Sequence, residues 1–149
     1  MLGVPLRAPH EIGCGAMAPE PTPSSQAERW KDDPDEHDYP AAHEFLCLML
    51  DTGVAKRTVR ELRTASVRRF KAKDLIRASN SVLLSFDDVH VAADLAKVDR
   101  GERLSPVLLV RGSLGDYPLV IADGFHRICA SYHLNENAEI PCRIVKLAH

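Results

Sequence analysis

Residues 106–145 read PVLLVRGSLGDYPLVIADGFHRICASYHLNENAEIPCRIV and carry the strongest secondary-structure signal in the chain. They contain three short apolar runs, each with the length of a strand, at residues 106–110, 119–121 and 140–145. Between the second and third runs, residues 124–134 place Phe125, Cys129 and Tyr132 at the spacing of one helix face. Strands and a helix in this order predict a compact α/β unit.

The turn between the second strand and the helix, Asp123-Gly124-Phe125-His126-Arg127, carries the chemistry of this unit. Glycine lets the backbone bend sharply, and the first amides of the following helix have no partners within it. The helix dipole adds a positive bias, so the turn is suited to an anion such as a nucleotide phosphate. Arg127 adds a planar fork of donors that matches phosphate oxygens. The predicted ligand-binding residues are Gly124, Phe125, His126 and Arg127.

Each of these residues also has a purely structural interpretation. Asp123 could cap the helix by accepting from a backbone amide, His126 could be an ordinary surface histidine, and Arg127 could pair with a carboxylate of its own chain. Because a carboxylate repels a phosphate, Asp123 would otherwise have to share a Mg²⁺ ion with it or act as a base toward a substrate hydroxyl. Asp123 and His126 are therefore the candidate catalytic residues.

The composition is that of an ordinary globular chain. Of its 149 residues, 45% are hydrophobic and 5% aromatic, so the core is expected to be mainly aliphatic. The formal net charge of −2 argues against nucleic-acid binding over the whole surface. No apolar run reaches the roughly 18 residues of a membrane span, and no secretory signal is recognisable. These features predict a cytoplasmic protein without a membrane partner.

The four cysteines predict neither a metal site nor a disulfide framework. Cys14, Cys47, Cys129 and Cys142 form no C-x-x-C pair. The last three sit among apolar residues, so they are expected to be buried, reduced and unreactive.

The chain is predicted to consist of a tail and one domain. Residues 1–26 are rich in Gly, Pro, Ala and Ser without an apolar period, which predicts disorder. Met17 offers an alternative to the first methionine as the start residue. Residues 27–149 are expected to form a single domain, with a helical N-terminal part over 27–85 and an α/β core over 86–149.

The apolar spacing predicts further helices over residues 40–50, around Val59 and Leu62, around Phe70, Leu75 and Ile76, and over residues 89–98. Asp87 or Asp88 is expected to cap the last of these helices, and Gly101 to mark its end.

Charge changes sign along this region. Eight carboxylates face two bases in residues 28–51, whereas nine bases face two carboxylates in residues 56–77. The range Lys56–Arg77 could be a contact surface for DNA or for a protein. Alternatively, the acidic segment folds back on it, or the bases are simply solvated.

Residues 106–145 resemble the ParB/sulfiredoxin superfamily. Sulfiredoxins show a similar course: a Pro-led strand, a glycine turn, a second strand, G-G-C-H-R, a helix and a closing I-P-A-K-L-V strand. Gly124, His126 and Arg127 match the G, H and R, and residues 140–145 match the closing strand. ParB proteins carry G-E-R-R at the turn, of which this chain has Gly124 and Arg127.

The resemblance implies an α+β fold, a small mixed sheet with flanking helices, preceded here by the helical N-terminal region. It implies that the 123–127 turn binds nucleotide phosphates: ATP in sulfiredoxins, CTP in ParB proteins, ATP or ADP in kinases of the superfamily. Phe125 replaces the sulfiredoxin cysteine, so sulfinic-acid reduction is not expected. Three functions stay open: a nucleotide-binding protein, with or without Mg²⁺; a phosphotransferase or nucleotide hydrolase; and a DNA-associated regulatory or antitoxin-type module.

Overall fold

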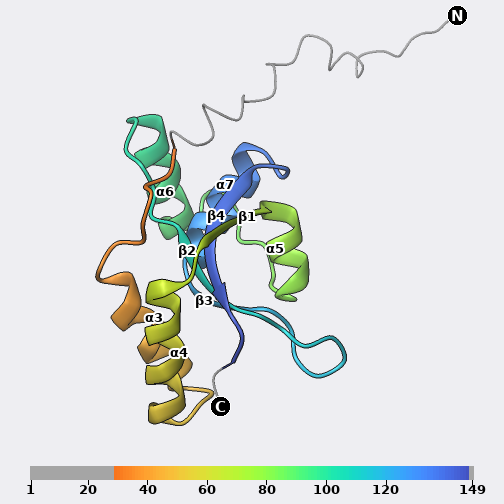
Figure 1. Cartoon of the computed structure of the whole chain (residues 1–149). Coiled ribbons are helices and arrows are strands. Elements are labelled where there is room, and N and C mark those ends of the chain that lie inside the picture. The colour runs from red at the N-terminus through yellow and green to blue at the C-terminus, as the bar shows by residue number, and fades with distance from the viewer. Residues whose placement is uncertain (1–28, 148–149) are drawn as a thin grey trace, which may run out of the picture.

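The computed structural model describes residues 29–147, which form a four-stranded sheet with helices on both faces (Figure 1). The elements are α3 (Asp38–Leu46), α4 (Thr52–Thr64), β1 (Val67–Lys71), α5 (Ala72–Ala78), α6 (Val89–Asp99), β2 (Val107–Val110), β3 (Val120–Asp123), α7 (Phe125–Leu134) and β4 (Glu139–Val145). The predicted α+β class and mixed sheet are confirmed. The predicted disordered tail, residues 1–26, lies outside the described residues.

The strand order in the sheet is β1-β4-β2-β3. The central strands β2 and β4 run parallel, while β1 pairs with β4 and β3 pairs with β2 in antiparallel fashion. All four residues of β2 are buried, as expected for a central strand with both faces covered. Because β3 runs antiparallel to β2 and leads directly into α7, the turn at residue 124 lies next to the start of β2.

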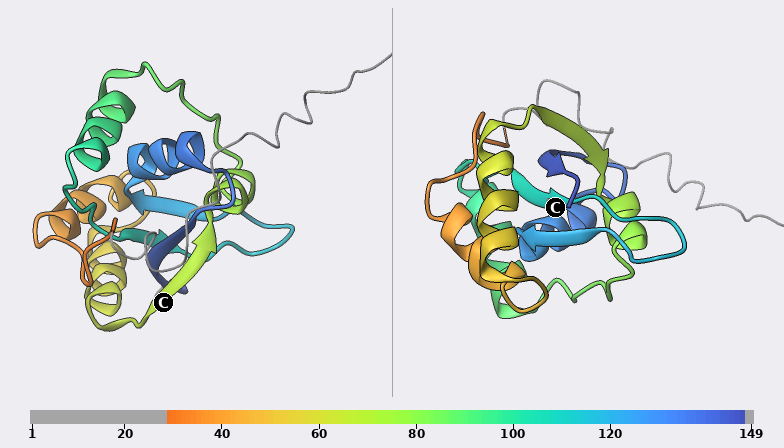
Figure 2. Two further views of the ribbon diagram at one scale, coloured as in Figure 1. Left: turned by 90° about the horizontal axis from the view of Figure 1, so that it is seen from above. Right: turned by 60° about the horizontal axis from the view of Figure 1, so that its bottom comes forward.

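Two layers of helices enclose the sheet (Figure 2). On one face, α3 and α4 pack on the sheet through side chains such as Leu46, Leu62 and Leu108. On the other face, α5 and α7 pack through a second cluster that includes Ile128 and Ile140. Helix α6 lies against the outer side of α7. The buried side chains are mostly aliphatic, as the composition predicts.

Strand β1 is the main departure from the predicted elements. The sequence placed Phe70 on a short helix, but Phe70 lies in β1, and the helix with Leu75 begins after the strand. The strand was missed because four of its five residues are exposed, so it shows no apolar alternation. Its conformation comes instead from backbone pairing with β4, which places Val67 opposite Arg143.

The ends of α6 follow local rules that the sequence had revealed. Asp88 Oδ1 accepts from the backbone amides of His90 at 2.9 Å and Val91 at 3.1 Å, so Asp88 is the cap. After the helix, Gly101 adopts φ of +79° and its N–H donates to the Val98 carbonyl at 3.0 Å. Both predictions for this helix are confirmed. Helix α3, by contrast, ends at Leu46 rather than near residue 50.

Two of the three cysteines in the described part of the chain are buried as predicted. Burial raises the pKa of the thiols of Cys129 and Cys142, which keeps them protonated and unreactive. The prediction is wrong in degree for Cys47, which is half-buried, with its Sγ 3.6 Å from His43 Nε2. Cys14 lies outside the described residues. None of the helices between residues 29 and 147 has the length and apolar character needed to span a bilayer.

Candidate functional site at the start of helix α7

Gly124 makes the sharp turn that the sequence predicted. Its φ is +107°, a conformation that side chains with a Cβ rarely adopt. A Cβ at this position would also collide with the Val107 side chain and come within 2.8 Å of Arg127 Nη2. Glycine therefore serves two purposes here, since it permits the backbone conformation and lets the turn sit against β2.

The first turn of α7 has no side-chain cap within the described residues. The amides of Phe125, His126 and Arg127 therefore lack partners, because the first N–H groups of a helix have none within it. Helix α6 offers a direct contrast, since its own Asp88 takes two of the equivalent amides. The interpretation of Asp123 as a cap is wrong, because its carboxylate is engaged elsewhere.

Asp123 and Arg127 form an ion pair one helical turn apart. Arg127 Nη2 lies 2.9 Å from Asp123 Oδ2 and 3.5 Å from Asp38 Oδ2. The Arg127 side chain is 16% exposed and that of Asp38 only 3%, so solvent screens these charges weakly. The alternative that Arg127 pairs with carboxylates of its own chain is confirmed.

Asp38 is the site residue that the sequence reasoning missed. It is the first residue of α3, and its carboxylate accepts a short hydrogen bond from Ser105 Oγ. Ser105 Oγ in turn accepts from the Asp35 backbone amide at 2.9 Å, which ties the chain before α3 to the segment before β2. Nothing local in the sequence distinguishes Asp38 from the other carboxylates of the acidic segment, most of which are exposed.

Carboxyl groups outnumber the arginine in this region. Burial raises the pKa of Asp123, and Asp38 adds to the rise, while Arg127 opposes it. Burial also raises the pKa of Asp94 on α6, against the attraction of Lys97. Asp94 and Asp123 are therefore protonated more readily than ordinary aspartates. Protonation relieves part of the repulsion among the carboxylates of this region.

His126 lies where the starts of α6 and α7 meet. Its ring centroid is 4.7 Å from that of His90 on α6, and it is half-buried. The Phe125 side chain packs beside buried Val91 and Cys129, as predicted from helix geometry. Phe125 also borders an apolar pocket of about 330 Å³.

Part of the Arg127 guanidinium is still available for a ligand. The two carboxylates engage Nη2, whereas Nε is buried without a hydrogen-bond partner within residues 29–147. Nη1 likewise forms no hydrogen bond within that range. No three His, Cys, Asp or Glu side chains in the described range come together in a way that could hold a metal ion.

Of the predicted site residues, the structure joins Asp123 and Arg127 in an ion pair and adds Asp38 and Ser105 to it. His126 lies against His90, and Phe125 packs among apolar side chains. No family model, curated protein or solved structure matches this chain. Fold and site together define a mixed α+β protein with a buried charge cluster at the start of α7.

Proposed function

We propose that this chain is a ParB/sulfiredoxin-like nucleotide-binding protein that holds phosphates at the 123–127 turn. The observation that carries the proposal is the uncapped first turn of α7, beside a helix, α6, whose first turn is capped by its own carboxylate. Three free amides and the positive end of the helix dipole are suited to a phosphate group. Gly124 allows such a group to approach the backbone closely.

In this proposal, Arg127 is held in place by Asp38 and Asp123 and contacts the phosphate through Nη1. Both donor edges of the guanidinium include Nη2, which the carboxylates engage, so Nη1 donates a single charge-assisted hydrogen bond to a phosphate oxygen beside the free amides of the turn. His126, in the same turn, supplies a further donor. Asp38 and Asp123 then serve as positioning residues for the arginine.

The surplus of carboxyl groups makes binding dependent on pH. Ionised Asp94 and Asp123 repel a phosphate, whereas their protonated forms do not. Because burial raises the pKa of each carboxyl, its protonated fraction at a given acidic pH is larger than that of an ordinary aspartate. Nucleotide affinity is therefore expected to increase as pH falls, and Mg²⁺ bound to the nucleotide is expected to reduce this dependence by offsetting phosphate charge.

The test is isothermal titration of the full chain with ATP, ADP and CTP, each with and without Mg²⁺. A charge-assisted hydrogen bond contributes about 1.5–3 kcal/mol, so Arg127→Ala should weaken binding roughly 10- to 150-fold. Arg127→Lys keeps the charge but not the fork and should recover part of the loss. His126→Ala should cause a smaller loss than Arg127→Ala.

Circular dichroism of each variant checks that it is folded at the titration temperature. Arg103→Ala, an exposed arginine after α6, is the matched control and should bind as the wild type does. Wild-type affinity in both Arg127→Lys and His126→Ala would contradict the proposal, as would a wild type that binds none of the three nucleotides.

A second candidate, phosphotransferase activity, is favoured by the environment of Asp123. A partly buried carboxyl with a raised pKa beside the proposed phosphates is suited to take a proton from a substrate hydroxyl. Asp123→Asn should then abolish ADP formation while nucleotide binding persists. Equal turnover by the wild type and Asp123→Asn would leave His126 as the candidate base.

A further inference from the structure

Helix α4 presents a basic face opposite its buried face. Its buried residues follow the spacing of one side of a helix: Ala55, Thr58, Val59 and Leu62. At 3.6 residues per turn, four bases fall within an arc of about 120° on the exposed side. They are Lys56, Arg57, Arg60 and Arg63.

Most of the bases in this region have no acidic partner among residues 29–147. Arg63 lies 2.5 Å from Glu36 of the acidic segment, and Arg77 pairs with Asp74 of its own helix. The remaining bases of residues 56–77 form no ion pair with any described residue: Lys56, Arg57, Arg60, Arg68, Arg69, Lys71 and Lys73. Within the described part of the acidic segment, residues 29–51, the alternative that this segment neutralises the bases therefore holds for Arg63.

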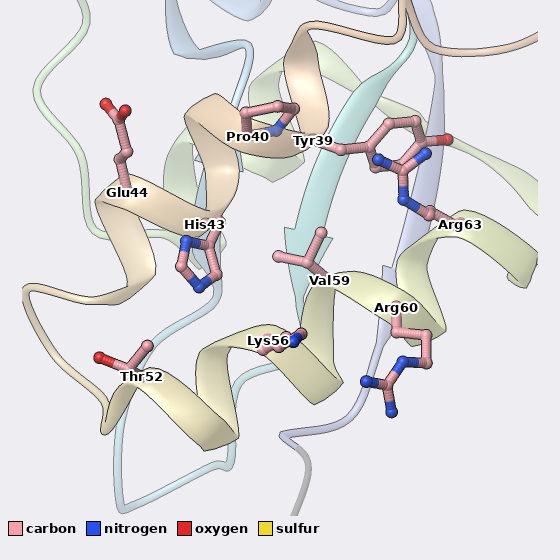
Figure 3. A pocket seen from close by; sticks show the side chains of 9 residues that line it. All are labelled: Tyr39, Pro40, His43, Glu44, Thr52, Lys56, Val59, Arg60 and Arg63. Carbon is pink, nitrogen blue, oxygen red and sulfur yellow. The ribbon is translucent and has the colours of Figure 1, made fainter.

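The basic face borders a groove between α3 and α4 with a volume of about 740 Å³ (Figure 3). Lys56, Arg60 and Arg63 line it from α4, and His43 extends into the space between the helices from α3. The Arg63 guanidinium stacks on the Tyr39 ring at 4.2 Å, which fixes its direction. Among the nine lining residues, Glu44 is the acidic one.

The basic surface continues from α4 onto the sheet edge. Strand β1 begins after two intervening residues, and its exposed bases Arg69 and Lys71 lie on the same face of the sheet as Arg143, which bonds to α4. The third exposed base of the strand, Arg68, lies on the other face, over the Phe70 ring. The helix is about 20 Å long and the strand about 16 Å. Unpaired positive charge spread over such a length suits a polymer of phosphates better than one small anion, and the arginine forks match phosphate oxygens.

We propose that the α4 face, its groove and β1 bind the phosphodiester backbone of a nucleic acid without reading its sequence. This surface is separate from the 123–127 turn, so the proposal is independent of nucleotide binding there. Bases that contact phosphates release counterions from the nucleic acid, which makes the affinity fall with salt.

The test is fluorescence anisotropy of a labelled 20-base-pair DNA duplex, and of one of its strands, with the full chain at 50–200 mM NaCl. Lys56→Ala/Arg60→Ala should reduce the slope of log affinity against log salt by about 2. Affinity at 50 mM NaCl should fall at least tenfold. Both positions are exposed on a helix, where alanine keeps the helix intact.

Arg100→Ala/Arg103→Ala is the matched control, because it removes the same charge from outside α4, β1 and the groove. It should bind within twofold of the wild type, and titration of Lys56→Ala/Arg60→Ala with ATP should match the wild type. Three results would overturn the proposal: no duplex or single strand bound at 50 mM NaCl, an equal loss in the control, or competition by poly-glutamate as strong as by unlabelled DNA. The last would identify an acidic protein as the partner.

Discussion

Replacing Arg127 with alanine removes the cation that pairs with one buried carboxylate, Asp38, and one partly buried carboxylate, Asp123. Arg127 Nη2 lies 2.9 Å from Asp123 and 3.5 Å from Asp38, and the Asp38 side chain is only 3% exposed. Breaking a buried ion pair by removing one partner costs about 3–5 kcal/mol, because the other charge remains buried and uncompensated. We therefore expect Arg127→Ala to lower the free energy of unfolding by about that amount at neutral pH. The total free energy of unfolding of a domain is commonly about 5–15 kcal/mol, so most of the population stays folded.

The loss should depend on pH in a defined direction. Burial and the nearby Asp38 already raise the pKa of Asp123 in the folded protein, whereas the positive charge of Arg127 lowers it. Replacing Arg127 with alanine removes that positive charge, so the pKa of Asp123 rises further. The folded state then holds a proton at pH values where an unfolded aspartate, with a pKa of about 3.9, has lost it. Stability therefore falls as pH increases through this window, and the variant recovers toward acid pH.

Urea unfolding at pH 7.5 and pH 5.0 measures this effect, with the fluorescence of buried Trp30 as the signal. The difference between wild type and Arg127→Ala should be smaller at pH 5.0. Adding Asp123→Asn to Arg127→Ala should restore part of the stability at pH 7.5, since it removes one of the two facing charges. A loss below about 1 kcal/mol at both pH values, or a larger loss at pH 5.0, would refute the reasoning.

Three further predictions concern the fold around the site. Gly124→Ala should lower the free energy of unfolding by about 2–4 kcal/mol, because it adds a collision with β2 to the strain of positive φ. Gly115→Ala, at φ +91° with open space around it, should lower it by about 1 kcal/mol, with thermal unfolding as the measurement for both variants. Asp88→Ala should lose about 1 kcal/mol with the α6 cap, while Asp87→Ala should change urea stability by less than about 0.5 kcal/mol. The Cys129 thiol should stay unlabelled in the native protein and react only after unfolding, and rapid labelling would show that α7 opens.

The features that could be predicted from the sequence are those that depend on residues close together along the chain. The strand-turn-helix-strand course of residues 106–145 is present, with Gly124 at positive φ and Phe125 packed inward. The cap at Asp88 and the stop at Gly101 are local as well. Helix caps and glycine turns follow from steric and hydrogen-bonding preferences within a few residues, so a single sequence reveals them.

The partners of these local elements depend on the tertiary fold and could not be predicted from the sequence. Strand β1 has exposed, mostly charged residues and exists because β4 pairs with it, more than 65 residues later in the chain. Asp38 is buried because the segment before β2 supplies Ser105 to bond it and α7 supplies Arg127 to neutralise it. The free energy of burying a carboxylate depends on partners that the fold brings from distant parts of the chain, and the residues flanking Asp38 do not encode them.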